Sequence, residues 1–190
     1  IGKSDVEKSK NIKSDTIFRI YSMTKPITSV ALMQLHEQGL FQLADPVGKF
    51  LPEFKNSKVF LQGSFPNFLT TPAKRDMTVR DLLSHTSGLT YGFHYQTNID
   101  HAYRKVWAGS KEEESDFNMP PMDLKTFSET IAKIPLEFSP GDRWNYSVST
   151  DICGRLIEVL SGLSLQEYFK KYIFKPCLLY TSDAADDEER

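Results

Sequence analysis

The sequence predicts an α+β fold in which helix predominates. From residue 22 to about 38, apolar side chains recur at spacings of three and four, as on one face of an amphipathic helix, and similar stripes return at 124–133 and from 148 onward. Strand-like runs are few and short, at 16–20 and 58–61. At 190 residues the chain is long enough for one domain with its own core.

Composition bounds the classes of function. The chain is 39% hydrophobic and 25% charged, with a mean hydropathy of −0.40, as is ordinary for a globular protein. Its net charge of −2 gives no reason to expect a nucleic-acid partner. No apolar run approaches the roughly 18 residues of a membrane span. Cys153 and Cys177 are too few for a disulfide framework. Oligomeric state stays open.

Both ends of the sequence indicate a piece of a longer protein. The chain begins at Ile1 without a signal-peptide pattern, so its cellular location cannot be read from it. Residues 177–186 can be encoded by DNA that looks like the transposon end and adapter of a sequencing library; a natural acidic tail is the alternative. We therefore expect a partial domain at 1–176 and an adapter-derived tail at 177–190.

The N-terminal part predicts a hairpin, a strand and a helix in that order. The polar, lysine-rich residues 1–13 are consistent with the remnant of a hairpin, and 16–20 with a strand. The helix that follows has Pro26 in its first turn, where a missing N–H costs nothing. Gly39 is a candidate C-cap for that helix.

Short elements and turns are expected in the middle of the chain. Asp45 is placed to cap a short helix whose first residue is Pro46. Residues 58–61 read as an edge strand, and 62–77 as a connection rich in Pro and Thr.

Thr78 and Asp81 have the spacing of a capping box and predict the start of a helix. Gly88 is expected to stop it. His85, just before a Thr-Ser-Gly sequence, invites a catalytic or metal role. More often, a histidine at such a helix end simply hydrogen-bonds the turn.

Residues 90–121 are long, aromatic and irregular, as expected of a wall or lid beside a functional site. The acidic run 112–114 within them is most simply a solvated face. His94 and His101 have no Cys or acidic partner at ligand spacing, so we predict no metal site.

The C-terminal part predicts three further helices. Asp123 caps the first, at 124–133. The second carries apolar residues from Val148 to Leu160 and ends at Gly162, and the third begins near Leu165.

Ser22 and Lys25 form a Ser-x-x-Lys pair at the expected helix start. A serine hydroxyl is a weak nucleophile until a neighbouring base takes its proton. A lysine one turn along lies on the same face and can be that base if burial lowers its pKa. The helix N-terminus also offers free N–H groups to an oxyanion. The pair alone is weak support, because roughly one or two are expected by chance, and a surface lysine would look the same.

Four motifs together make the pair specific, because their order and spacing resemble the serine β-lactamase-like family. Within that family the nearest likeness is to class C β-lactamase-related esterases and D-Ala-D-Ala carboxypeptidases, over about residues 14–176. The motifs are Phe18–Lys25, Leu43–Val47, Leu82–Leu89 and Pro140–Ser147.

The resemblance implies roles for three residues. Ser22 would be the acylated nucleophile, Lys25 its base partner, and Tyr146 a second base or proton relay. Lys25 would lower the pKa of Tyr146 by favouring the phenolate. The implied reaction is acyl transfer through an acyl-enzyme, with backbone N–H groups, that of Ser22 included, holding the oxyanion. It requires no metal or organic cofactor. Tyr146 could otherwise be a half-buried aromatic at a helix start.

The chain departs from the family pattern at Val148. Where β-lactamases and carboxypeptidases have Tyr-x-Asn, this chain has Tyr146-Ser147-Val148. The Asn amide binds the amide of their substrates, which Val148 cannot do, so this substrate-binding position favours esters. The third family motif, on a sheet strand, is not found before residue 176. The implied β-lactamase/transpeptidase-like fold is therefore a helical lobe beside an incomplete antiparallel sheet.

We therefore predict a serine hydrolase of small carboxylic esters, with the 190-residue chain itself inactive and only marginally stable. The first alternative is a β-lactamase or D-Ala-D-Ala carboxypeptidase, whose small-molecule substrate is an amide. The second is a non-catalytic binding module on the same fold.

Overall fold

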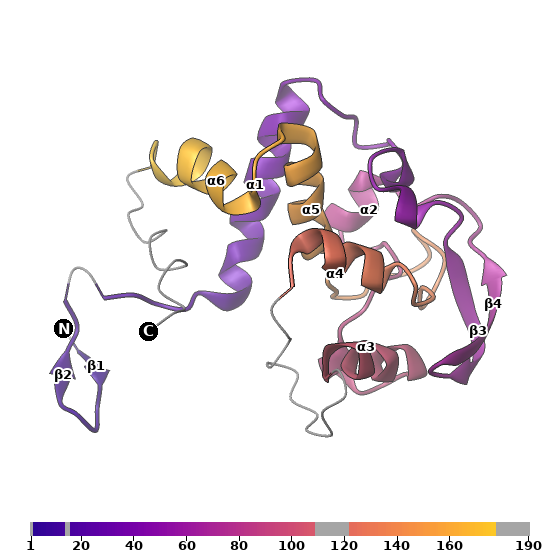
Figure 1. The fold of residues 1–190 in the computed structure, drawn as a ribbon, viewed down its shortest axis with the longest axis horizontal. Coiled ribbons are helices and arrows are strands. Elements are labelled where there is room, and N and C mark those ends of the chain that lie inside the picture. Colours follow the sequence, from indigo (N-terminus) through magenta and orange to yellow (C-terminus); the bar gives the residue numbers. More distant parts are fainter. Residues whose placement is uncertain (1, 14–15, 109–121, 178–190) are drawn as a thin grey trace.

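Helices form the body of the molecule, and two β-hairpins lie at its edges (Figure 1). The computed structural model describes residues 2–13, 16–108 and 122–177. The predicted mixture, mainly helical with small antiparallel sheets, is confirmed. In chain order the elements are β1 Lys3–Asp5, β2 Lys10–Asn11, α1 Thr24–Glu37, β3 Lys58–Ser64, β4 Asn67–Pro72, α2 Val79–Leu83, α3 Asn98–Ala108, α4 Leu124–Ile131, α5 Ser149–Ser161 and α6 Leu165–Phe169.

Helices α1 and α5 pack against each other in the core. Leu35 of α1 is buried where the helical pattern placed it, and Leu32, which that pattern did not include, is buried as well. Ile152 and Leu156 of α5 are fully buried. Each such side chain stabilises the fold by about 2 kcal/mol. Val30, which the same pattern placed on the apolar stripe, is instead 54% exposed.

Residues 16–20 do not form the predicted strand. They run without regular secondary structure, and no strand pairs with them in the described part of the chain. A strand is stable only within a hydrogen-bonded ladder, so Ile17 and Phe18 stay 54% and 60% exposed. The hairpin expected in 1–13 is confirmed, because β1 pairs antiparallel with β2.

The prediction that 62–77 is a connection is wrong. Strand β3 continues to Ser64 and pairs antiparallel with β4, which lies wholly inside that range. Phe60 and Phe68 pack edge to face across the hairpin, with their ring centroids 5.7 Å apart. Cross-strand aromatic packing of this kind stabilises a pair of strands and here outweighs the Pro and Thr turn signals.

Asp45 does not cap a helix. Its carboxylate accepts hydrogen bonds from the Gln42 backbone N–H and the Lys49 ammonium, each at 2.9 Å. The element that follows is a single 3₁₀ turn, Val47–Lys49, which begins after Pro46. The Asp45 carboxylate, which was predicted to cap a helix, therefore binds Gln42 and Lys49 instead.

The prediction that 90–121 is irregular is wrong for residues 98–108, which form α3. Ile99, Ala102 and Tyr103 of this helix are buried at helical spacing. The acidic run 112–114 lies outside the described residues. So does the predicted tail, apart from Cys177, which is exposed.

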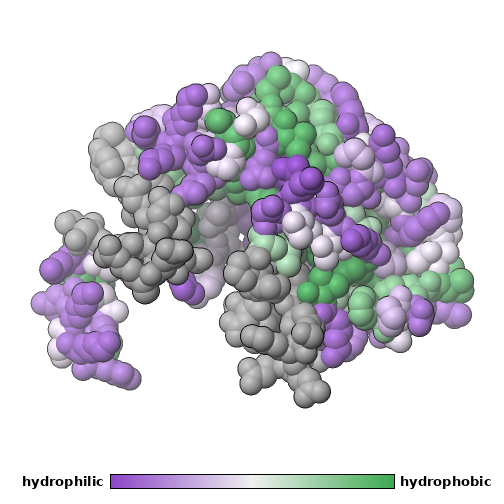
Figure 2. Space-filling model, in the orientation of Figure 1, coloured by the Kyte–Doolittle hydropathy of each residue, from purple (hydrophilic) through white to green (hydrophobic). Residues whose placement is uncertain are grey.

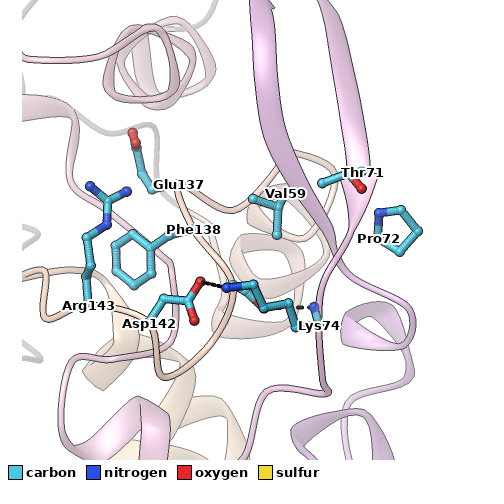
Figure 3. A pocket seen from close by; sticks show the side chains of 9 residues that line it. Val59, Thr71, Pro72, Lys74, Glu137, Phe138, Asp142 and Arg143 are labelled. Atoms are coloured by element: carbon cyan, nitrogen blue, oxygen red, sulfur yellow. Dashed lines mark hydrogen bonds and ion pairs between the residues drawn. The ribbon is translucent and has the colours of Figure 1, made fainter.

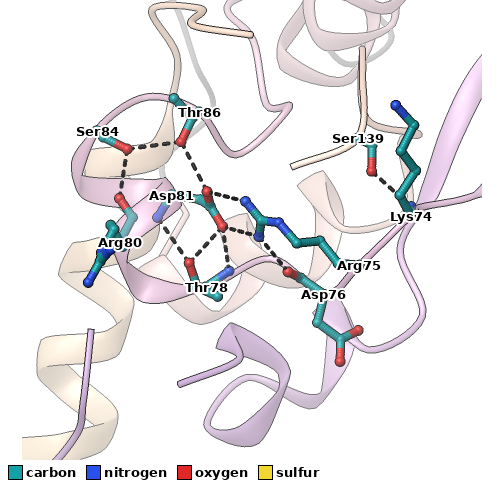
Figure 4. A network of polar contacts seen from close by, with 9 residues as sticks. All are labelled: Lys74, Arg75, Asp76, Thr78, Arg80, Asp81, Ser84, Thr86 and Ser139. Carbon is teal, nitrogen blue, oxygen red and sulfur yellow. Dashed lines mark hydrogen bonds and ion pairs between the residues drawn. The ribbon is translucent and has the colours of Figure 1, made fainter. Parts of the chain in front are cut away.

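Asp81 anchors the turn that follows α2 (Figure 4). The predicted capping box with Thr78 is present, and the Asp81 carboxylate also accepts two hydrogen bonds from Arg75, at 2.7 and 2.8 Å, and one from the Thr86 hydroxyl at 3.0 Å. Burial alone would raise the pKa of Asp81, but these donors outweigh it and hold the pKa at about 2.

Helix α2 ends at Leu83, well before Gly88, which serves the turn instead. Gly88 has φ +86°, and a Cβ there would lie 2.3 Å from the Phe138 carbonyl oxygen. Only glycine fits that close approach.

The predicted Asp123 cap of α4 and the predicted end of α5 at Gly162 are confirmed, and α6 has a cap that was not predicted. The Asp123 carboxylate accepts a hydrogen bond from the Thr126 N–H at 2.7 Å at the start of α4. Gly162 ends α5 in the left-handed conformation, with φ +72°. Ser164 and Glu167 form a capping box at the start of α6.

Candidate active site

Ser22 lies in a 3₁₀ turn, Tyr21–Met23, directly before α1, and Lys25 lies in the first turn of that helix. Tyr21 has φ +45°, which is uncommon for a bulky residue and turns the chain sharply just before the serine. The predicted placement of Ser22 at the helix N-terminus, with Lys25 one turn later, is found in the structure.

The structure brings Ser22, Lys25 and Tyr146 together. The Lys25 Nζ lies 3.3 Å from the Ser22 Oγ and donates to it. The Tyr146 hydroxyl donates to the same Oγ at 2.7 Å, from a segment that leads into α5. Because α1 and α5 pack side by side, residues 124 positions apart in the sequence meet at one oxygen atom.

The pKa of Tyr146 is lowered from its ordinary value. Burial acts to raise it, but hydrogen bonds to Lys25 and Ser22, together with the positive charge of Lys25, outweigh that effect. The phenolate form of Tyr146 is therefore more accessible near neutral pH than that of a free tyrosine.

Two tyrosine rings flank the Lys25 ammonium. Its Nζ lies 4.9 Å from the ring centroid of Tyr146 and 5.5 Å from that of Tyr91, and the two rings are 5.3 Å apart. Tyr91 also stacks on Phe93 at 4.6 Å. The aromatic faces hold the cation by cation–π attraction. The beginning of the predicted aromatic stretch thus lies beside the site.

The prediction missed Asp151. This residue in the first turn of α5 hydrogen-bonds the Tyr91 hydroxyl and interacts electrostatically with Lys25. Although the residue as a whole is exposed, its surroundings withdraw the carboxylate from water and raise its pKa, while Lys25 acts in the opposite direction. An acid in a first helical turn is commonplace, so the sequence offers no signal that sets Asp151 apart.

His85 lies at the edge of the site, with its ring centroid 5.0 Å from that of Tyr146 and 6.2 Å from that of Trp144. Its backbone N–H donates to the Leu82 carbonyl in the turn after α2. Burial and the nearby Lys25 charge lower the pKa of His85.

Val148 is not at the surface of the site. Its side chain is 1% exposed and belongs to the hydrophobic core, just before α5 begins. The expectation that it contacts substrate therefore needs correction, because α5 starts at Ser149 and turns Val148 inward. The other part of that prediction, that this position offers no asparagine amide to a substrate, is unaffected.

A separate hollow of about 460 Å³ lies beside the β3–β4 hairpin (Figure 3). Within it, Lys74 forms an ion pair with Asp142 at 2.7 Å, and the Arg143 guanidinium lies over the Phe138 ring at 4.7 Å. It shares no lining residue with the Ser22 site.

Within the described ranges, no three His, Cys, Asp or Glu side chains gather as a metal ion would need. No helix there is long and apolar enough to cross a bilayer.

Helix α1, which follows the Ser22 turn, packs on α5, which follows the Tyr146 segment, beside small antiparallel sheets. The solved structures similar to this one share this fold, the β-lactamase/transpeptidase fold. The family model described as Beta-lactamase matches residues 1–189, and the chain belongs to this family.

Relatives named for ester and acyl chemistry are similar to the chain. Acyltransferase calJ of Penicillium decumbens is 34% identical over 86% of this chain and 37% of its own length. Esterase EstB of Burkholderia gladioli is 31% identical over 92% of this chain and 40% of its own. EstCE1, a hydrolase with promiscuous acyltransferase activity, superimposes with a TM-score of 0.70 at 26% identity, covering 92% of this chain and 41% of that one. The chain thus spans about two fifths of their length.

Proposed function

We propose that the protein carrying this segment is a serine hydrolase that forms an acyl-enzyme at Ser22, acting on small carboxylic esters. The observation that carries the proposal is the convergence of the Lys25 Nζ and the Tyr146 hydroxyl on the Ser22 Oγ, at 3.3 and 2.7 Å. A nucleophile within hydrogen-bond reach of a base that a third group orients has the geometry of nucleophilic catalysis.

In the acylation step, the Tyr146 phenolate takes the Ser22 proton across the 2.7 Å contact while Oγ attacks the ester carbonyl carbon. Lys25 stabilises the phenolate before the transfer, which is the direction in which it moves the pKa of Tyr146. The carbonyl oxygen becomes an oxyanion, held by N–H groups at the N-terminus of α1, including that of Ser22. Tyr146 then returns the proton to the departing alcohol.

In the second step, the Tyr146 phenolate takes a proton from water while the water oxygen attacks the acyl carbon. Tyr146 then returns that proton to the Ser22 Oγ as the bond between Oγ and the acyl carbon breaks, which releases the acid and restores Ser22. An alcohol in place of water would make the same step an acyl transfer. The names of the similar proteins include both an esterase and an acyltransferase, and they support the shared acyl-enzyme rather than one acceptor.

The local sequence supports an ester over an amide. The position where amide-cleaving relatives have asparagine is Val148, which is buried and offers no amide to a substrate. A site built without that polar partner gains little from a substrate amide. The alternatives remain a β-lactamase or D-Ala-D-Ala carboxypeptidase, and a binding module without turnover.

The test is made on the longer protein that carries this segment, and compares hydrolysis of a short-chain p-nitrophenyl ester with that of a chromogenic cephalosporin, in wild type and Ser22→Ala. We expect ester hydrolysis that Ser22→Ala abolishes. Cephalosporin hydrolysis in place of ester hydrolysis would favour the amide alternative. Ester turnover that survives in Ser22→Ala contradicts the assignment, and lack of Ser22 labelling by a fluorophosphonate identifies a binding module.

A further inference from the structure

A row of buried hydroxyl groups begins at His85 and continues into the core. The His85 Nδ1 lies 3.2 Å from the Ser147 Oγ, which lies 2.7 Å from the Ser149 Oγ, which in turn lies 2.7 Å from the Ser87 Oγ. All three serines are 0% exposed. We call Ser147, Ser149 and Ser87 the serine row. It joins the turn after α2 to the start of α5.

The row has a preferred direction, because each hydroxyl donates one proton. The Ser87 Oγ accepts from the Leu89 N–H at 3.2 Å, and among the described residues its own proton has the Ser149 Oγ as acceptor. Ser149 then donates to Ser147, and Ser147 donates to the His85 Nδ1. The opposite direction would leave the buried Ser87 proton without an acceptor, at a cost of about 1–3 kcal/mol.

In this direction the His85 Nδ1 must be an acceptor. The imidazole is therefore neutral and carries its proton on Nε2. Its surroundings favour this state: the imidazole is half-buried, and the charge of Lys25 on α1 opposes a second positive charge. The nearby acid on its own element, Asp81, is already paired with Arg75.

His85 also binds the chain on both sides of Tyr146. Its carbonyl oxygen accepts from the Asn145 N–H at 2.8 Å, and its Nδ1 accepts from the Ser147 hydroxyl. Between these two hydrogen bonds, the Tyr146 ring packs against the imidazole with centroids 5.0 Å apart. One histidine therefore contacts three successive residues, and the middle one reaches Ser22.

We propose that His85 is a positioning residue for Tyr146, which in its neutral form holds the phenol within reach of Ser22 through the residues on either side. The proposal rests on the proposed function, in which Tyr146 is the base. If Nδ1 were protonated, both it and the Ser147 hydroxyl would be donors at the same contact. The hydrogen bonds of the serine row would then have to reverse direction or break. An acidic pH would then loosen Tyr146 before it affected the fold.

Ser147→Ala tests the link, because it removes the donor and leaves the imidazole in place. The neutral imidazole loses a hydrogen bond, so we expect the pKa of His85 to rise. We also expect fluorophosphonate labelling of Ser22 to slow about tenfold, as a displaced base predicts. The matched control is Ser128→Ala, which removes another fully buried hydroxyl. Ser128 lies on α4, outside the serine row, and donates to Glu53. The Ser128→Ala variant should cost stability without changing either readout.

His85→Asn keeps an acceptor near the position of Nδ1 and suits the backbone of His85, whose φ of +56° asparagine tolerates well. We expect it to label within about threefold of wild type but to lose the acid-side fall in labelling that titration of His85 causes. Loss of one imidazole signal in this variant also identifies His85 among the four histidines by ¹⁵N NMR.

The NMR experiment separates this proposal from the proposed function. An Nε2–H tautomer whose pKa rises in Ser147→Ala supports the placement of His85 whether or not Ser22 reacts. An Nδ1–H tautomer, or a Ser147→Ala variant with unchanged pKa and unchanged labelling, overturns the proposal. Wild-type protein that fails to label at Ser22 contradicts the proposed function, and with it the catalytic reason for holding Tyr146.

Discussion

Tyr146 contacts both Ser22 and Lys25. Its hydroxyl contacts Ser22 at 2.7 Å, and its ring lies 4.9 Å from the Lys25 ammonium. The Lys25 cation stabilises the phenolate and so lowers the pKa of Tyr146. In the proposed mechanism, Tyr146 is therefore the base for Ser22, without a histidine or carboxylate acting on Ser22 directly.

Tyr146→Phe should therefore lower kcat/KM for a p-nitrophenyl ester by about 10²–10⁴-fold, the range expected for loss of a general base. In the wild type, the rate should rise with pH up to the lowered pKa of Tyr146 and then level off, and this limb should vanish in the variant. The control is Tyr172→Phe, whose ring packs on Tyr168 and whose rate should match wild type. A retained pH limb in Tyr146→Phe would rule out the phenolate as base.

Individual site residues differ in how far the sequence could predict them. Ser22 and Lys25 follow from helical spacing, because three positions on a helix fix their relative placement. Tyr146 lies 124 positions from Ser22, and only the family pattern placed it there. Val148 was misplaced because its orientation depends on where α5 begins. Asp151 has no local signature, since its role depends on tertiary contact with Tyr91 and Lys25.

Among the elements, the capping box of α2 could be predicted, but the further hydrogen bonds to its Asp81 carboxylate could not. Thr78 and Asp81 show the capping-box spacing, whereas Arg75 and Thr86 reach the same carboxylate through the fold of the turn (Figure 4). The turn held in this way carries His85, so the stability of α2 and the geometry beside Tyr146 depend on one acid.

Asp81→Asn should destabilise the chain by about 1–2 kcal/mol at pH 7, after allowance for solvent screening of Arg75. The folded pKa of Asp81, about 2, lies below its ordinary value of 3.8. This stabilisation is thus fully present above about pH 5 and is lost as the pH falls through the folded pKa. Urea denaturation of wild type and variant should therefore converge at low pH.

Asp142→Asn is the matched control for this measurement. Asp142 also contacts a cation, Lys74, at 2.7 Å, but both side chains are substantially exposed. An exposed pair contributes little, so the variant should stay within about 0.5 kcal/mol of wild type. Equal losses in the two variants, or a loss in Asp81→Asn that does not depend on pH, would argue against the buried network as the cause.

The elements that prediction missed share one physical cause. Helix α3 and strand β4 are defined by burial of Ile99, Tyr103 and Phe68 against distant parts of the chain, while their local sequences carry turn and aromatic signals. The converse error at 16–20 has the same origin, because a strand-like sequence forms no strand without a partner. Tertiary context decided all three segments.

At the scale of the whole molecule, apolar surface remains where a compact fold would cover it. Beside the nucleophile, Phe18, Tyr21 and Met23 are 60%, 69% and 69% exposed. On the face seen in Figure 2, apolar side chains also show over the β3–β4 hairpin, where Leu61 and Leu69 are each 55% exposed. The segment before α1 and the hairpin are therefore two of the places where apolar side chains remain uncovered.

We predict that the 190-residue chain by itself has marginal stability and does not turn over esters. It spans only about two fifths of the relatives' length. In the described residues no sheet strand lies with the N-terminus of α1, to which the proposed mechanism assigns the oxyanion. Removing one oxyanion donor typically costs 10²–10³-fold in kcat.

The 190-residue chain should bind a dye that reports exposed apolar surface, and it should unfold at low urea concentration. A chain extended to the relatives' length should lose the dye signal and gain ester turnover. Ester turnover by the 190-residue chain at a rate equal to that of the extended protein would contradict this prediction and show that the described helices suffice for catalysis.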